Sequence, residues 1–187
     1  HTERVRTLAV TGKGELISGA DNDPIHVWNT NSGRLLATET FQCVSYYIYV
    51  LLVIPALAKS KKNNNETGKE EEKEEELLLG SGHDNSISVW SVSTGQLLRT
   101  LVGHTHSVTM LAQDNSIRNR RQVVSWAKDN TVKVWCVDTG LQVRSFASEC
   151  NSDSSMVVTS RGDWLVCATG KDRFLSVWNL KTGEKIR

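Results

Sequence analysis

The chain has 187 residues, enough for one ordinary domain, and its 22 lysine and arginine residues nearly balance 21 aspartate and glutamate residues. The resulting net charge of +1 gives no reason to expect a specific nucleic acid or a membrane surface as a partner. Because the four cysteines have neither zinc-site nor disulfide-scaffold spacing and no signal-peptide pattern is present, we expect an intracellular, cytoplasmic setting.

One pattern of ten residues occurs four times along the chain, as VWNTNSGRLL, VWSVSTGQLL, VWCVDTGLQV and VWNLKTGEKI. The segments ISVW, VKVW and LSVW alternate apolar residues with a period of two and are rich in β-branched types, which indicates strands. The STG, DTG and KTG triplets that follow indicate tight turns, since glycine adopts a positive φ at little cost. Each copy therefore predicts two strands around a turn, with two further strands upstream.

The tryptophans of the four copies are separated by 62, 45 and 43 residues, and the third copy also carries GHTHSV upstream, at residues 103–108. Six residues before each tryptophan stands Asn or Asp. These spacings resemble the WD-repeat family of β-propellers, whose period is about 40–45 residues, and loosely the WD repeats of NACHT-type proteins. No tryptophan here is followed by the Asp of the family pattern. The resemblance implies an all-β fold of four antiparallel four-stranded blades, at residues 1–40, 41–100, 101–146 and 147–187, in an incomplete or open ring.

In WD-repeat proteins a His, a Ser or Thr, an Asp and the Trp form a hydrogen-bonded tetrad within a blade. The resemblance places these structural tetrads at His1, Ser18, Asn22 and Trp28; at Asp84 and Trp90; at His104, Ser125, Asp129 and Trp135; and at Asp172 and Trp178. In the second and fourth blades Gln42 and Glu149 stand near the expected histidine. Because the set recurs in each repeat, we interpret it as architectural and not as a catalytic triad.

The long first interval contains a charged insertion, KSKKNNNETGKEEEKEEE, at residues 59–76. It has no apolar side chain large enough to pack, so we expect it to be disordered. Before it lies an uncharged segment, residues 41–58, of borderline length for a membrane span. The repeat spacing instead places residues 46–50 on the innermost strand of the second blade, so we expect no membrane partner. Residues 51–58 could extend that strand, pack outside it, or not belong to the natural repeat.

The remaining motifs carry little chemistry. ATGKD at residues 168–172 lacks the spaced glycine and the Ser or Thr of a phosphate loop, and it predicts a turn. We predict no enzyme activity, no cofactor and no metal site. RNRR at residues 118–121 falls in the loop equivalent to the one that carries the acidic insertion. Transient pairing of Arg118, Arg120 and Arg121 with residues 70–76 is therefore a hypothesis, beside the simpler interpretation as a solvated loop.

The turns between second and third strands lie on the opposite face, which commonly binds peptides or proteins in this family. Candidate partner-binding residues there are Asp23, His83, His106, Lys128, Lys171 and Arg173. The sequence thus predicts a non-catalytic protein-interaction scaffold. Two alternatives are a sensor domain of a NACHT-type signalling NTPase and a ubiquitin-ligase substrate receptor. Because propellers of this family most often have seven blades, we expect a fragment, with further blades supplied by the missing chain.

Overall fold

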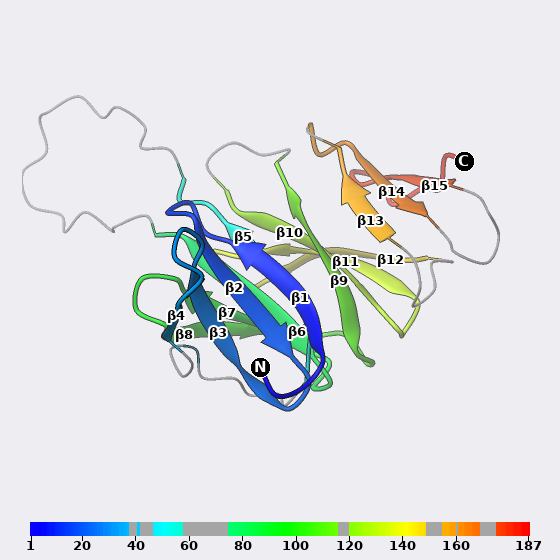
Figure 1. Cartoon of the computed structure of the whole chain (residues 1–187). Helices are drawn as coiled ribbons and strands as arrows, with labels where there is room; N and C mark the ends of the chain where they lie inside the picture. Colours follow the sequence, from blue (N-terminus) through cyan, green and yellow to red (C-terminus); the bar gives the residue numbers. More distant parts are fainter. Residues whose placement is uncertain are drawn as a thin grey trace, which may run out of the picture.

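A computed structural model describes residues 1–37, 41, 47–57, 75–115, 120–148, 155–159, 161–168 and 175–187. These residues form antiparallel sheets that follow one another in chain order, and no helix occurs among them (Figure 1). The first sheet contains β1 (Val5–Val10), β2 (Glu15–Ala20), β3 (Asp23–Asn29) and β4 (Leu35–Ala37). The second contains β5 (Ile48–Ile54), β6 (Leu77–Gly82), β7 (Ile87–Ser91) and β8 (Leu97–Leu101).

The third sheet contains β9 (Val108–Asp114), β10 (Gln122–Ala127), β11 (Thr131–Cys136) and β12 (Gln142–Ala147). The fourth contains β13 (Ser155–Val158), β14 (Trp164–Ala168) and β15 (Leu175–Asn179). It therefore has three strands among the described residues instead of the expected four, and a bridge between Trp178 and Lys185 stands where the outer strand begins. The all-β propeller architecture with an unclosed ring is as predicted.

The predicted turns after each tryptophan are present in all four sheets. The glycine five residues after the tryptophan has φ between 67° and 77°, and its N–H donates to the carbonyl four residues earlier at 2.7–2.9 Å. The four pairs are Gly33 to Asn29, Gly95 to Ser91, Gly140 to Cys136 and Gly183 to Asn179. A positive φ explains why each repeat requires glycine here.

Successive sheets bury their apolar faces against each other, with the tryptophans of the second, third and fourth sheets each packed against the preceding sheet. Trp90 lies in one cluster with Ile17 and Ile25 of the first sheet. Trp135 packs in the same way with residues of the second sheet, and Trp178 with residues of the third. Since Ile17 faces the second sheet and side chains alternate along a strand, Trp28 lies on the outer, open face of the first sheet.

The apolar segment of the second blade forms a strand over residues 48–54. This strand is β5, which pairs with β6 and lies between β1 and β9 at the centre of the fan of sheets. Residues 48–50 lie on the innermost strand of the second sheet, as the repeat spacing predicts, whereas residue 46 lies outside the described residues. The strand extends through Ile54, immediately before Pro55, whose missing N–H suits a strand end. No helix among the described residues is long and apolar enough to cross a membrane. The insertion, apart from Glu75 and Glu76, lies outside the described residues.

Replacement of Gly80 by alanine should destabilise the interface between the first two sheets. A Cβ at this position would lie 2.9 Å from both Leu51 Cδ2 and Trp90 Cζ3, inside a packed core. We expect a loss of about 1–3 kcal/mol in the free energy of unfolding, measured by urea denaturation.

Gly12→Ala is the matched control, because the nearest atom to a Cβ there is Glu76 Oε1 at 3.4 Å, at the outer limit of a tight contact. Its free energy of unfolding should change by no more than roughly 0.5 kcal/mol, as expected of a surface substitution. Equal midpoints for the two variants would show that the close packing at Gly80 is not required.

Candidate functional site

The third sheet contains a complete tetrad. Trp135 Nε1 donates to Ser125 Oγ at 2.8 Å, Ser125 Oγ lies 2.8 Å from His104 Nε2, and His104 Nδ1 lies 2.9 Å from Asp129 Oδ2. Because the carboxylate can only accept, the His104 proton is on Nδ1, and Nε2 accepts from the serine hydroxyl. The donors thus all point one way, from the buried indole out to the carboxylate.

Asp129 accepts further hydrogen bonds at the outer end of the hydrogen-bonded tetrad. The N–H of Thr105 donates to Oδ2 at 2.9 Å, and the N–H and hydroxyl of Thr131 donate to Oδ1 at 3.0 and 2.7 Å. Burial alone would raise the pKa of the Asp129 carboxyl, but the bonds from Thr131, Thr105 and His104 together lower it to about 2. Burial lowers the pKa of His104 against the opposing effect of Asp129, so the neutral imidazole is favoured.

The first sheet contains an equivalent tetrad with one corrected member. Trp28 Nε1 donates to Ser18 Oγ at 2.7 Å, and His1 binds Ser18 through Nε2 and, through Nδ1, the carboxylate of Asp23 at 2.9 Å. The N–H of Thr2 donates to Asp23 Oδ2 at 2.9 Å, as Thr105 does to Asp129. The assignment of Asn22 to this tetrad is therefore wrong, and Asp23 takes its place.

A change in turn length explains the correction. The β2–β3 turn contains only Asp21 and Asn22 between the paired residues Ala20 and Asp23, and the register shifts between Ser18 and Ala20. Asn22 takes the left-handed conformation, with φ of 50°, and its Nδ2 donates to Tyr47 Oη at 3.3 Å. With its carboxylate bound to His1, Asp23 is only 11% exposed and offers little surface to a partner, and the partner-binding role stays a prediction.

The second and fourth sheets lack the tetrad serine. Counting ten residues back from the tryptophan, Gly80 and Ala168 stand where Ser18 and Ser125 stand in the other sheets. Asp84 instead accepts a hydrogen bond from Ser86 Oγ at 2.7 Å. The expected positions Gln42, Glu149 and Asp172 lie outside the described residues.

The first sheet carries an additional histidine beside its tetrad. The His26 ring stacks on His1 with centroids 3.8 Å apart and an interplanar angle of 10°. His1, Asp23 and His26 offer possible metal ligands within 4.8 Å of one another. However, both His1 nitrogens already bind Asp23 and Ser18, and lone pairs in two parallel rings do not converge on one point. We therefore interpret this group as structural.

Aromatic and cationic side chains meet at the end of the sheets that carries the β2–β3, β6–β7 and β10–β11 turns. Arg6 lies 6.0 Å and Lys128 Nζ 5.8 Å from the centroid of Tyr49, and the His83 ring lies 5.5 Å from it. The His83 ring is also 5.2 Å from that of Tyr47. We call Arg6, Tyr47, Tyr49, His83 and Lys128 the tyrosine cluster. Cations at these distances are attracted to the ring face of tyrosine.

Charges around the tyrosine cluster are held in place by one ion pair. Arg6 Nη2 lies 2.7 Å from Asp21 Oδ2, and Arg6 Nε donates to both carboxylate oxygens at 2.9 and 3.0 Å. This hydrogen bonding raises the pKa of Arg6 and lowers that of Asp21. Burial raises the pKa of Tyr49, so the phenol stays neutral near pH 7.

Sequence reasoning identified His83 and Lys128 but missed the residues they surround. Tyr47 and Tyr49 alternate along the chain just before and within β5, and that spacing is a signal that both point to one face. His106 is exposed, and its Nδ1 accepts a hydrogen bond from the N–H of Ser107 at 2.8 Å. Lys171 and Arg173 lie outside the described residues.

Ser125→Ala should test the tetrad of the third sheet. Removal of this fully buried hydroxyl leaves Trp135 Nε1 and His104 Nε2 without their partner, so we expect a loss of about 2–3 kcal/mol in the free energy of unfolding. Urea denaturation at pH 7 measures it, with exposed Ser155→Ala as the control. A loss no larger than that of the control would contradict the proposed hydrogen-bonded chain.

Asp129 should make stability depend on pH in the acid range. Its folded pKa of about 2 lies below the unfolded value of 3.8, so its contribution is complete above about pH 4 and is lost as pH falls toward 2. The contribution is about 2 kcal/mol at neutral pH. Urea denaturation of the protein and of Asp129→Asn at several pH values should show their difference shrinking over this window. A difference in stability that stays constant over this pH range would show that the carboxylate charge is not its cause.

Comparison with known proteins agrees with this geometry. The family profile described as WD domain, G-beta repeat, matches residues 95–136. The structure is similar to the crystal structure of RRP9 WD40 repeats, with a TM-score of 0.73 and 22% sequence identity over 100% of this chain and 51% of that chain. This chain thus spans about half of the RRP9 chain, and no curated protein sequence matches it. The chain therefore carries a WD40 repeat at residues 95–136 and has the fold of WD40-repeat β-propellers.

Proposed function

We propose that this chain is a non-catalytic protein-interaction scaffold of the cytoplasm, part of a larger WD-repeat propeller, that binds a peptide or protein at the tyrosine cluster. The observation that carries the proposal is the convergence of Tyr49, His83 and Lys128 from three separate segments on one end of the sheets. Tyrosine and arginine, both present in the tyrosine cluster, are among the residue types that dominate binding energy at protein interfaces.

The buried state of the tetrads supports a non-catalytic role for them. The serines that would have to act as nucleophiles are 2% exposed at Ser18 and 0% exposed at Ser125. Each accepts a hydrogen bond from a tryptophan indole and contacts a histidine that is itself bound to a carboxylate. A substrate carbonyl has no approach to such a hydroxyl, so the Ser-His-Asp sets fit an architectural role.

Two open sheet faces support the proposal of further blades. Leu8 and Val10 of β1 are each 58% exposed on the outer face of the first sheet, on the same side as Trp28. On the outer face of the fourth sheet Val157 is 58% and Leu175 62% exposed. Apolar faces of this kind are association surfaces.

The isolated chain should therefore self-associate. We expect light scattering after size exclusion to give a mass above the 20.8 kDa of one chain, because burial of the open faces is favourable. Val10→Lys should reduce this association, whereas Lys13→Glu, an exposed change in the neighbouring turn, should not. A sharp, folded monomer at high concentration would contradict the expectation that further blades cover these faces.

The binding role of the tyrosine cluster can be tested by selecting peptides from a displayed random library on the purified protein. We expect the peptides that survive to lose affinity about 30-fold or more for Tyr49→Ala and Lys128→Glu, the loss typical of central contact residues. Thermal midpoints of both variants establish that they remain folded. Arg34→Glu is the control, because Arg34 is exposed in the β3–β4 turn, at the other end of the first sheet from the tyrosine cluster. Selected peptides that bind all the variants alike would rule out the cluster as the site.

A further inference from the structure

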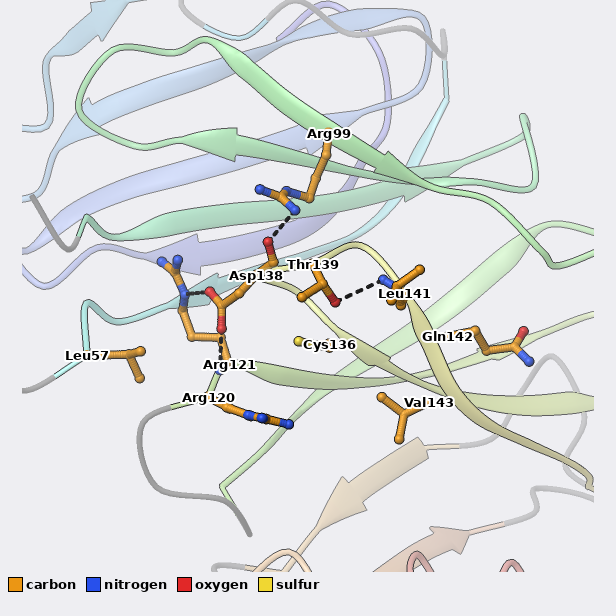
Figure 2. A pocket seen from close by; sticks show the side chains of 10 residues that line it. All are labelled: Leu57, Arg99, Arg120, Arg121, Cys136, Asp138, Thr139, Leu141, Gln142 and Val143. Atoms are coloured by element: carbon orange, nitrogen blue, oxygen red, sulfur yellow. Dashed lines mark hydrogen bonds and ion pairs between the residues drawn. The ribbon is translucent and has the colours of Figure 1, made fainter. Parts of the chain in front are cut away.

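A cleft opens at the other end of the sheets, where the second and third blades meet. It has a volume of about 730 Å³, within the range of about 300–1,000 Å³ common for ligand sites. Ten residues line it (Figure 2): Leu57, Arg99, Arg120, Arg121, Cys136, Asp138, Thr139, Leu141, Gln142 and Val143. Arg121 precedes β10 and Lys128 follows it, so the cleft and the tyrosine cluster lie at opposite ends of that strand.

Two of the three arginines are held in position by Asp138. Arg121 Nε lies 2.6 Å from Asp138 Oδ1, the N–H of Arg121 donates to Oδ2 at 3.0 Å, and Nη1 donates to the carbonyl of Glu75 at 2.9 Å. From the other side Arg99 Nη1 donates to the backbone carbonyl of Asp138 (Figure 2). A guanidinium group has five N–H donors, so both keep donors beyond these bonds while their rotation is restricted. Side chains fixed in this way lose little entropy when they bind a ligand.

Arg120 supplies a positive charge that is not neutralised within the described part of the chain. Its side chain is exposed and makes no ion pair there, and it extends away from the Arg99, Arg121 and Asp138 group in Figure 2. With three arginines and one aspartate, the lining has a formal charge of +2, although the whole chain carries only +1. The positive charge is therefore local to this cleft.

Apolar side chains that are open to solvent also line the cleft. Leu141 and Val143, at the start of β12, are 67% and 49% exposed. β12 is the outermost strand of its sheet, and the cleft is concave. A concave site with fixed guanidiniums and exposed aliphatic side chains complements carboxylates next to an apolar side chain. The ten lining residues include no aromatic ring, which does not suit stacking of nucleic-acid bases.

We propose that this cleft binds an acidic linear peptide of a partner protein, with its carboxylates on Arg99, Arg120 and Arg121 and an adjacent apolar side chain on Leu141 and Val143. The proposal rests on the scaffold function proposed above and names a second surface, on the face opposite the tyrosine cluster. The earlier hypothesis that the RNRR segment pairs with the acidic insertion concerns residues largely outside the described part. Within that part, the contact is between Arg121 and the Glu75 carbonyl.

The test uses a fluorescein-labelled peptide, GEEDLLG, and its lysine counterpart, GKKKLLG, in anisotropy titrations on the whole chain. We expect the acidic peptide to bind at least tenfold more tightly than the lysine peptide at 50 mM NaCl, and raised salt to reduce that difference. Arg120→Glu and Leu141→Asp should each weaken binding of the acidic peptide about tenfold or more. Arg34→Glu makes the same charge change at an exposed arginine of the first blade and should leave binding unchanged.

Three results would overturn the proposal. One is equal binding of both peptides, and another is equal weakening by Arg34→Glu and Arg120→Glu, which would indicate a general charge effect. The third is displacement of the acidic peptide by inorganic phosphate at millimolar concentration with no effect of Leu141→Asp, which would indicate a simple anion site. Lys128→Glu serves to separate the two proposals, because it should weaken binding of the library-selected peptides about 30-fold or more and leave GEEDLLG binding intact.

Discussion

Burial of one tryptophan between each pair of successive sheets is the constraint on which the rest of this structure depends. Trp90, Trp135 and Trp178 each pack against the sheet before them, and the apolar strand residues around them form the three cores. An indole buried in this way contributes a large apolar surface but also an N–H that must find an acceptor. In the third sheet Ser125 is that acceptor, and the need to orient its hydroxyl explains why His104 and Asp129 follow in a chain.

The second sheet meets the same packing constraint by different means. Gly80 stands at the position of the tetrad serine, and the Trp90 ring occupies the space that a side chain would need there. Close packing of Leu51 and Trp90 against this glycine thus fills the position that the serine side chain occupies in the third sheet. The consequence is that the repeat tolerates loss of the tetrad serine provided that the volume between the sheets stays filled.

The repeat allowed the all-β fold and the turns to be predicted from sequence, because each turn glycine and each buried tryptophan answers a local requirement that recurs. Prediction failed where spacing was counted across a turn of different length. The two-residue turn of the first sheet moves the tetrad carboxylate from Asn22 to Asp23. The surfaces were harder still to predict. Tyr49 and Lys128, or Arg99 and Asp138, are distant in the chain and are brought together only by the packing of neighbouring sheets.

The two complete tetrads differ in burial, and this difference bears on the open face of the first sheet. Trp135 is buried by the sheet before it, whereas Trp28 lies half-buried beside the exposed Leu8 and Val10. Hydrogen bonds and charge pairs strengthen as water is excluded from them. A blade that covered the first sheet would therefore bury Trp28 as the second sheet buries Trp135, and would strengthen the hydrogen bonds among Ser18, His1 and Asp23. On the uncovered face, the tetrad of the first sheet is therefore less shielded from water than the tetrad of the third sheet.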